Sequence, residues 1–380
     1  MHRRPRVLFL TLDGPRGLGH LSRAAKLAQS VQESAACLIT TGLRDTCHLL
    51  PENCEYVRVP GLDGLPGFQE PASSAMAALG DRARSIRREL FLTLERTFSP
   101  DLIVAEQYPT GWYGEWEALL AHSRALKWIV FRPVPGTNTV DVVDDAGRAV
   151  LAEIYDTFLI ASDRRTAVVD DDLGFTELER AKCRYIGYAS LPVSEAEIAE
   201  ARAQRGLAPG ERWVVCSAGA GLVTADLIED CLRLAGEFPD LQFDIVAGPR
   251  GRSAANGGLP SRYTDGRIRF ATQRRDLRVA HAAADVVICH GGYNTVSEAM
   301  QGGAALIVDG RRDVNDERQR HARLLQRHYP VALAVGTADL AHHLRAVLSE
   351  NLDRRRTRAR AALDLGGCAN FARLVADRLG

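Results

Sequence analysis

The chain has 380 residues, of which 46% are hydrophobic and 25% are charged, an ordinary globular composition with room for two domains. Lysine and arginine together number 48, as do aspartate and glutamate, so the formal net charge is zero. Proteins that bind nucleic acid non-specifically normally carry a strong basic excess. We therefore expect no nucleic-acid partner.

The first apolar run, Val7–Leu10, is short and is soon followed by Asp13. It predicts a strand rather than a signal peptide, and no run approaches the ~18 apolar residues of a membrane span. The eight cysteines show no CxxC pairing and no zinc-type spacing with histidine. Cys216 and Cys289 fall inside apolar runs, which favours reduced, buried thiols and a cytoplasmic location.

The first half of the chain alternates short apolar runs with longer amphipathic ones. The short runs predict strands at 7–12, 36–40, 56–59, 102–105, 128–131 and 157–160. The amphipathic runs predict helices at 21–32, 81–98 and 113–122. Strands separated by helices favour a parallel sheet that is covered on both faces.

The pattern pauses at 185–192, which we interpret as a linker, and a second series then begins. Its strands are predicted at 213–217, 243–247, 268–270, 286–289, 305–308 and 332–334. Its helices are predicted at 194–205, 222–237, 275–283, 294–302, 315–327 and 338–349. The predicted fold class is therefore α/β, with two doubly wound, Rossmann-like domains at 1–188 and 189–365.

The loop after the first predicted strand combines glycines with a histidine, ending in Gly17-Leu18-Gly19-His20. Ligands of such sheets bind outside the carboxyl ends of the strands, and glycines let the backbone approach them closely. His20 could accept a proton from a hydroxyl group there, with Glu106, which ends another apolar run, orienting the imidazole and raising its basicity. The alternatives are a glycine-rich turn and a carboxylate that caps the next segment.

A second candidate loop, HGGYNTVSEA at 290–299, follows the run 286–289. Its two glycines open a predicted helix, whose backbone amides, with Asn294 and Thr295, could hold a diphosphate. Glu298 falls near the end of the first predicted turn, where it could accept hydrogen bonds from a ribose diol. The alternative is a structural strand–turn–helix with Asn or Thr as the cap.

Other segments have weaker signals. The loop 309–319 is dense in hydrogen-bonding groups that could bind sugar hydroxyls, although a solvated helix start would look the same. The run Asp170–Asp172 has the Asp-x-Asp spacing of metal-dependent transferases, but it lies in a polar stretch. We interpret it as a solvated acidic turn and expect no metal.

An acceptor site is expected in the first domain. Candidates are the loop 60–74, the loop 132–136 and three aromatic residues, Trp112, Tyr113 and Trp116, because aromatic side chains offer sugars and rings a flat apolar face. Trp112 and Trp116, at helical spacing, are as easily core residues. Membrane association is disfavoured, although an anionic or membrane-bound acceptor could be attracted by the arginines at 82, 84, 87 and 88.

Three motifs together resemble the GT-B glycosyltransferases, particularly the branch with the peptidoglycan N-acetylglucosaminyltransferase (family 28) and a set of bacterial predicted glycosyltransferases. They are Gly17–His20 followed by Arg23, the stretch FSPDLIV at 98–104 with Pro109, and HGGYNTVSEA at 290–299. The resemblance covers almost the whole chain and is weakest at 60–80 and 136–179. It implies two domains facing across a cleft, and a last segment, 366–380, packed back on the first domain.

The resemblance also implies roles for individual residues of a nucleotide-sugar site. His20 is the implied base and Glu298 the implied ribose ligand, while Glu106 is assigned as the partner of His20 from its position alone. The implied diphosphate-binding residues are Gly19, Gly219, Gly221, His290, Gly291, Gly292, Asn294 and Thr295. The implied base-binding residues are Phe270, Thr272 and Gln273, and the donor-sugar residues Asp316, Glu317 and Arg318.

One departure concerns the donor sugar, which the family often binds with an Asp-Gln or Gln-Gln pair. This chain has Glu317-Arg318 when it is aligned on Ala322, so an atypical sugar is plausible.

We expect a glycosyltransferase that moves a sugar from a UDP-linked donor to a hydroxyl or amine of a small molecule. The expected reaction proceeds with inversion and without metal or cofactor, in a monomer or homodimer. The alternatives are a nucleotide-sugar hydrolase, an epimerase, and a non-catalytic nucleotide-sugar-binding subunit.

Overall fold

The structure is a computed structural model. It describes residues 3–11, 18–43, 49–61, 80–135, 145–219, 225–248, 266–271, 274, 277–311 and 317–380. The chain divides into two compact units. Unit 1 comprises Met1–Ala189 and Gly366–Gly380, and unit 2 comprises Ser190–Leu365. Each unit has its own parallel sheet and its own hydrophobic core.

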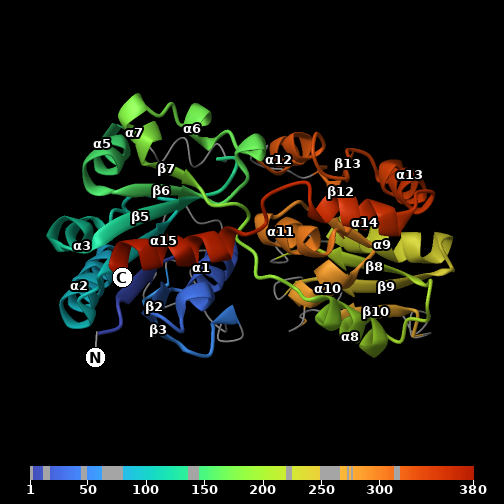
Figure 1. Ribbon diagram of the computed structural model, residues 1–380, viewed down its shortest axis with the longest axis horizontal. Helices are drawn as coiled ribbons and strands as arrows, with labels where there is room; N and C mark the ends of the chain where they lie inside the picture. The colour runs from blue at the N-terminus through green and yellow to red at the C-terminus, as the bar shows by residue number, and fades with distance from the viewer. Residues whose placement is uncertain are drawn as a thin grey trace. The chain divides into compact units, whose positions relative to one another are not determined.

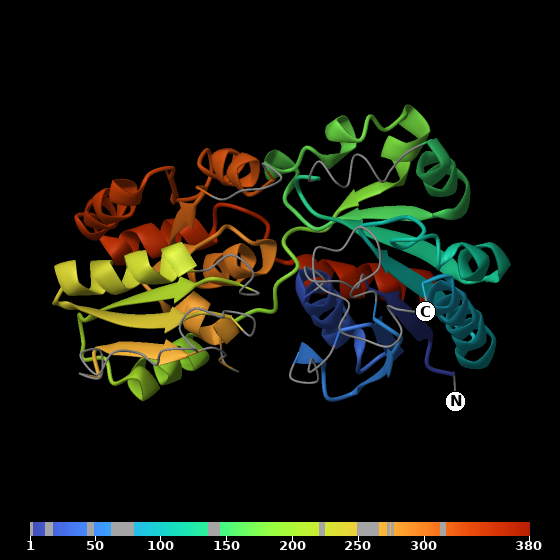
Figure 2. The ribbon, with the colours of Figure 1, turned by 180° about the vertical axis from the view of Figure 1, so that it is seen from behind.

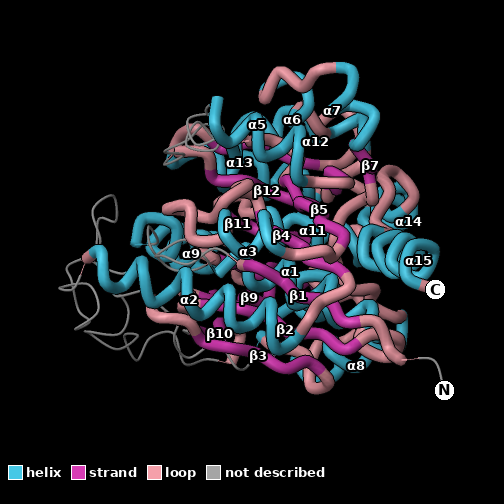
Figure 3. Tube along the Cα trace, turned by 90° about the vertical axis from the view of Figure 1, so that its left-hand side faces the viewer, coloured by secondary structure: helices cyan, strands magenta, loops and turns pink. Residues whose placement is uncertain are grey.

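The sheet of unit 1 has the order β3-β2-β1-β4-β5-β6-β7, with every neighbouring pair parallel. Figure 3 shows β3, β2, β1, β4 and β5 following one another in this sheet. Its strands are β1 (Arg6–Leu10), β2 (Ala36–Thr41), β3 (Cys54–Arg58), β4 (Leu102–Glu106), β5 (Leu126–Phe131), β6 (Thr157–Ile160) and β7 (Cys183–Tyr185). Its helices are α1 (Leu18–Val31), α2 (Asp81–Phe98), α3 (Glu117–His122), α5 (Asp145–Ile154), α6 (Val169–Asp172), α7 (Glu177–Lys182) and α15 (Gly367–Leu379). A 3-10 turn spans Arg164–Thr166.

Helix α15 returns to unit 1 and lies beside α1 (Figure 1). Its Phe371 ring is fully buried, with centroids 6.2 Å from Phe9 and 6.0 Å from Trp128. At the start of the helix, a Cβ on Gly367 would come within 2.5 Å of the Tyr188 backbone, so glycine is required at this close approach. The last segment of the chain is thus part of the core of unit 1.

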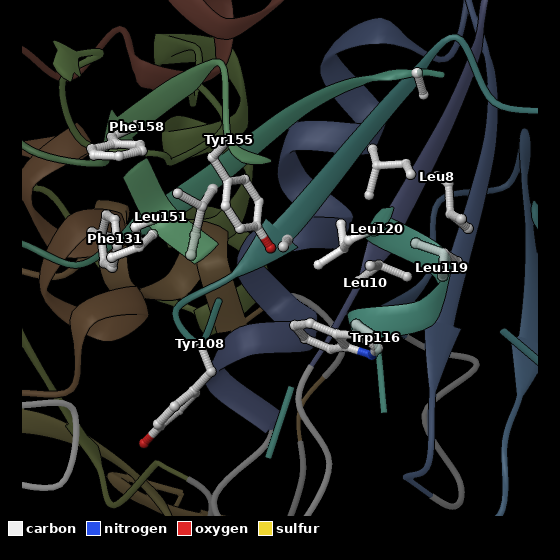
Figure 4. Packing of buried hydrophobic residues seen from close by; sticks show 14 of the residues in the cluster. Leu8, Leu10, Tyr108, Trp116, Leu119, Leu120, Phe131, Leu151, Tyr155 and Phe158 are labelled. Carbon is white, nitrogen blue, oxygen red and sulfur yellow. The ribbon is translucent and has the colours of Figure 1, made fainter. Parts of the chain in front are cut away.

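The opposite face of this sheet also carries an apolar cluster, because alternate strand residues point to opposite sides. Leu8 and Leu10 of β1 belong to it, and Figure 4 shows Trp116 lying among Leu10, Leu119 and Leu120. All of these side chains are buried. Continuous apolar strands with two buried faces are typical of parallel sheets.

The sheet of unit 2 has the order β10-β9-β8-β11-β12-β13, again with parallel neighbours. Its strands are β8 (Arg212–Ser217), β9 (Leu241–Val246), β10 (Ile268–Ala271), β11 (Val286–Cys289), β12 (Ala305–Asp309) and β13 (Val331–Ala334). Its helices are α8 (Glu195–Arg205), α9 (Ala225–Glu237), α10 (Leu277–Ala283), α11 (Tyr293–Gly302), α12 (Glu317–Leu325), α13 (Thr337–Leu348) and α14 (Leu352–Arg360).

Two helix layers cover this second sheet. Leucines of α9 and α13 pack with the strands in one apolar cluster, and Figure 2 shows α9, in yellow, running along the sheet. Helix α10 packs against both α8 and α11. A Cβ on Gly302 of α11 would lie only 1.7 Å from the Ala282 carbonyl oxygen of α10, so the two backbones are in direct contact.

Helices interleaved with two parallel sheets confirm the predicted doubly wound α/β class. The helix predicted at 113–122 is wrong in its first part, because α3 begins only at Glu117. The preceding residues turn at Gly111 and Gly114, whose φ angles of 84° and 72° interrupt a right-handed helix.

Candidate functional site

The predicted motifs fall at the place in each sheet where the strand order reverses. That place lies between β1 and β4 in unit 1 and between β8 and β11 in unit 2. His20 follows the loop after β1, and Glu106 is the last residue of β4. Gly219 follows β8, and His290 follows β11. In open α/β sheets, ligands bind outside the carboxyl ends of the strands at such switch points.

The first candidate site is built on His20 and Glu106, whose side chains are 13% and 1% exposed. Nδ1 of His20 lies 3.3 Å from Oε2 of Glu106. A carboxylate can only accept a hydrogen bond, so this contact requires the proton on Nδ1. The other ring nitrogen, Nε2, is then the one that can accept a proton from a substrate.

Arg23 is the third member of this cluster. Its Nε donates to Oε1 of Glu106 at 3.0 Å, its Nη2 donates to Oε2, and the same Nη2 lies 3.4 Å from Nδ1 of His20. Both Arg23 and Glu106 are 1% exposed, so the pair is a buried ion pair. The sequence indicates Arg23 only as part of a family pattern. Its spacing of three from His20, which puts both residues on one helix face, is the signal that could have found it.

Glu106 raises the pKa of His20, as predicted, but burial of the ring outweighs this effect. Burial lowers the pKa of His20 most, and the positive charges of Arg23 and Arg132 add to this effect. The hydrogen bond and charge of Glu106 oppose it, but the pKa still falls to about 4. Glu106 therefore orients the ring of His20, while burial of the ring keeps its basicity low.

Gln107, directly after Glu106, has strained backbone. Its φ is 67°, a left-handed conformation that is unusual for a residue other than glycine, and its side chain is buried. Its Oε1 accepts from the backbone N and the Nε of Arg132, at 3.4 and 3.3 Å. Strain of this kind collects at functional sites, and no sequence signal pointed to it.

Two of the residues considered for the acceptor are buried, and for Trp116 this is the core alternative that its spacing left open. Trp116 is fully buried in the core, and Arg87 is 1% exposed and bound to Glu115 at 3.0 Å and to the Pro60 carbonyl. Neither can meet an acceptor. Trp112 instead packs edge-on against Tyr108, with centroids 4.9 Å apart, and Arg84 lies 4.7 Å above the ring of Tyr113. Residues 62–79 and 136–144 lie outside the described residues.

The second candidate site is the turn between β11 and α11. Gly291 has a φ of 74°, and a Cβ there would lie 2.8 Å from a methyl group of Val308. Gly292 is the N-cap of α11, and no described atom lies within 4 Å of the position its Cβ would take. The amides of a helix start point outward and favour negative charge, so the open side of Gly292 suits a phosphate.

Charged side chains surround this turn. Nδ1 of His290 lies 3.6 Å from Oδ2 of Asp309, the last residue of β12. Arg311 donates from Nε to Asp309 at 2.8 Å and lies 2.7 Å from Asp230. Although burial opposes it, the hydrogen bonds from Arg311 lower the pKa of Asp309. Asp309 is therefore a charged partner for the imidazole of His290.

The implied donor-sugar residues lie on α12, which begins at Glu317. Arg318 is exposed, and its Cβ lies 3.4 Å from the position a Cβ on Gly291 would take. The start of α12 therefore borders the turn between β11 and α11. Asp316 lies outside the described residues.

Glu298 lies in the second turn of α11, since the helix begins at Tyr293, and not at the end of the first turn as predicted. Its carboxylate is 11% exposed, and its Oε2 accepts from Nδ1 of the buried His281, at 2.9 Å. Sequence reasoning missed His281. Thr295 on the same helix is buried, and Asn294 is half-buried.

The remaining implied residues are less well defined. Phe270 lies on the edge strand β10 and packs partly against the core, while Thr272, Gln273 and Gly221 lie outside the described residues. Gly219 has a φ of 67°, and a Cβ there would meet no described atom within 4 Å. Gly19 is exposed in the first turn of α1.

The acidic run at 170–172 was predicted to be a solvated turn, and this prediction is wrong for Asp170. Asp170 is buried and accepts from Arg180 at 2.8 Å, and Asp171 accepts from the same guanidinium at 2.8 Å. Over the part of the chain that the structure describes, no group of three or more His, Cys, Asp or Glu could hold a metal ion. No helix within those residues has the length and apolarity needed to span a bilayer.

Residues 251–379 match the family model of the glycosyltransferase family 28 C-terminal domain. No curated protein matches the sequence. Among solved structures, SnogD, a glycosyltransferase from Streptomyces nogalater, has 20% identity and a TM-score of 0.62, over 98% of this chain and 99% of its own. UGT89C1 from Arabidopsis thaliana, complexed with UDP, has 15% identity and a TM-score of 0.67, over 98% and 99%.

A Listeria monocytogenes protein assigned as a UDP-N-acetylglucosamine 2-epimerase is also similar, with 13% identity and a TM-score of 0.63, over 99% of this chain and 96% of its own. At these identities the structural likeness establishes the fold. The fold and the domain match together support the expected enzyme class, a glycosyltransferase. The chain has the GT-B fold, and the match to the glycosyltransferase family 28 C-terminal domain covers much of unit 2 together with the last helix, α15.

Proposed function

We propose that the protein transfers a sugar from a UDP-linked donor to a hydroxyl or amine of a small molecule, with inversion at the anomeric carbon. The observation that carries the proposal is that each switch point has beside it a group suited to one half of this reaction. An imidazole with Nδ1 held by a carboxylate borders the switch point of one sheet, and a glycine-opened helix start borders that of the other. Sugar transfer needs one group to deprotonate an acceptor and another to hold a departing diphosphate.

In the proposed acceptor half of the reaction, Nε2 of His20 accepts the proton of the acceptor hydroxyl. The oxygen then forms its bond to the anomeric carbon as the bond from that carbon to the diphosphate breaks. The electron pair of the broken bond leaves with the diphosphate. Glu106 accepts from Nδ1 of His20 and so holds the tautomer that leaves Nε2 open to the proton, while Arg23 holds the carboxylate of Glu106.

In the proposed donor half, the negative charge that develops on the leaving diphosphate is stabilised by the start of α11. The helix dipole and the amides at Gly292, together with the side chains of Asn294 and Thr295, supply the positive potential. Glu298 accepts hydrogen bonds from the ribose. Because the helix start supplies this potential, we expect activity to persist in the presence of a chelator.

UDP binding tests the donor site, with Gly292→Ala as the matched variant. At 100 times its dissociation constant, UDP should stabilise the wild type by about 2.7 kcal/mol, which raises Tm by roughly 5–10 °C for a domain of this size. The alanine methyl would enter the open space at Gly292, so affinity should fall by about tenfold or more while the Tm without ligand stays nearly unchanged. Calorimetric titration and thermal melts measure both quantities.

The products then separate the alternatives. Release of UDP that depends on an acceptor supports transfer, and full release without one supports a hydrolase. A changed sugar still attached to the nucleotide supports an epimerase, the activity assigned to the similar Listeria monocytogenes protein. Binding of UDP-sugars with no product in any acceptor panel supports a non-catalytic subunit. The cytoplasmic location and a monomeric or homodimeric state stay predictions.

The pH dependence follows from the environment of His20. Only the unprotonated ring can act as a base, and the pKa of His20 lies at about 4 rather than at the ordinary 6.5. The ring therefore stays unprotonated as the pH falls from 7 to 5. We expect kcat/KM to remain level over this range for as long as the protein stays folded. A tenfold or greater loss between pH 7 and pH 5 would contradict the assignment.

A further inference from the structure

His281 has no place in the proposed reaction, yet it is among the most buried polar side chains of unit 2. It lies on α10, is 1% exposed, and its Nδ1 is 2.9 Å from Oε2 of Glu298 on α11. The carboxylate can only accept, so Nδ1 carries the proton. Nε2 is buried without a hydrogen-bond partner among the described residues. A proton on Nε2 would be a buried, unsatisfied donor, so the contact to Glu298 defines the tautomer.

The ring of His281 is held in place by the packing of its helix. Gly302 lets the backbone of α11 touch α10 at Ala282, directly after His281. The carbonyl of Ala283 accepts from Arg202 of α8 at 3.0 Å and from Arg356 of α14 at 3.4 Å. Helix α10 is therefore held by three neighbouring helices, so the backbone that carries the imidazole has a fixed position relative to α11.

This fixed donor restricts the carboxylate of Glu298. With Oε2 bound to His281, the carboxylate plane cannot rotate without losing a buried hydrogen bond, so Oε1 keeps one direction. A pair of ribose hydroxyls binds a carboxylate well only when its acceptor oxygens are already aligned. Without the imidazole, Oε2 of Glu298 would lose this buried donor, and the carboxylate would change its orientation to satisfy its other contacts.

We propose that His281 is a positioning residue, which aligns the carboxylate of Glu298 for the ribose diol and thereby sets the preference for ribonucleotides. The inference rests on the proposed function, because it assumes that Glu298 meets a ribose. It makes a prediction that a purely structural histidine would not make. Loss of the imidazole should weaken binding only of nucleotides that carry the ribose hydroxyls.

Calorimetric titrations with UDP and with 2′,3′-dideoxy-UDP, which lacks both ribose hydroxyls, test this on the full chain. The wild type should bind UDP about tenfold or more tightly than the dideoxy analogue. In His281→Leu this preference should fall to nearly one, with the affinity for the dideoxy analogue unchanged. His281→Asn should restore most of the preference, because the asparagine amide can place a donor near the position of Nδ1.

Three results would overturn the proposal. His281→Leu could keep the wild-type preference, it could lose affinity for both nucleotides equally, or His281→Asn could fail to restore the preference. If His281→Leu does not fold, His281→Gln is used in its place. The glutamine side chain is longer than that of asparagine, so its amide lies beyond the Nδ1 position and does not replace the lost donor. If the wild type binds neither nucleotide, the proposed function fails and this inference with it. Binding with an unaltered preference in the variant overturns this inference alone.

Discussion

Replacing His20 with alanine is expected to lower the turnover of the acceptor reaction by about 10²–10⁴-fold, the usual contribution of a positioned general base. The affinity for UDP should change by less than about twofold, because His20 belongs to unit 1 and the residues expected to bind the nucleotide, apart from Gly19, belong to unit 2. The measurements are kcat for the transferred sugar and a calorimetric titration with UDP. The split between turnover and affinity is what identifies a base.

The control is His122→Ala, which removes an exposed imidazole from α3 in the same unit. Its turnover should match that of the wild type. Unchanged turnover in His20→Ala would reject the catalytic role. The Arg23–Glu106 pair would then be a structural ion pair at the carboxyl end of β4. Equal losses of turnover and of UDP affinity would instead point to a damaged fold.

Much of this candidate site could be predicted from the sequence, because its residues lie at or just after the ends of predicted strands. His20 and Glu106 were predicted to act together from their positions after two apolar runs, and they lie 3.3 Å apart. They meet because β1 and β4 are neighbours, with Leu10 opposite Ala105. The chain order does not give that pairing, since β2 and β3 lie between these strands in sequence.

The burial of several candidate side chains could not be predicted, for one physical reason. The spacing of residues along the chain does not show whether a side chain faces the core or a ligand. Trp116 and Arg87 come from segments with helical or turn-like patterns, and tertiary packing buries both. The acidic neighbours of Asp170 predict a solvated side chain, but Arg180, ten residues further on, binds it. Long-range partners of this kind leave no local signal.

His281 is the clearest example of what the sequence could not give. It is one histidine in an alanine-rich helix, without the glycines that drew attention to His20 and His290. Its contact with Glu298 exists only because α10 and α11 pack closely, and that closeness depends on a glycine at the far end of α11. His281 and Gly302 are far apart along the chain, so the sequence does not show that the contact of His281 depends on this glycine.

Gly302→Ala is therefore expected to reduce stability more than the same change at any other glycine that the structure describes in unit 2. The new Cβ would lie 1.7 Å from the Ala282 carbonyl oxygen, and backbone cannot give way as a flexible side chain can. The unfolding free energy should fall by more than about 3 kcal/mol, which lowers Tm by roughly 6–12 °C for a domain of this size. Thermal and denaturant unfolding measure the change.

The matched control is Gly236→Ala on α9, another helical glycine, whose Cβ would meet no described atom within 4 Å. It should be neutral or stabilise the protein by about 0.5–1 kcal/mol, because alanine is the better helix former. Where Gly302→Ala still folds, α10 must move away from α11, and the contact from His281 to Glu298 must lengthen. Its preference for UDP over the dideoxy analogue should then fall as in His281→Leu. A variant as stable as the wild type would show that the two helices can separate freely, and that His281 is not held in the position from which it could align Glu298.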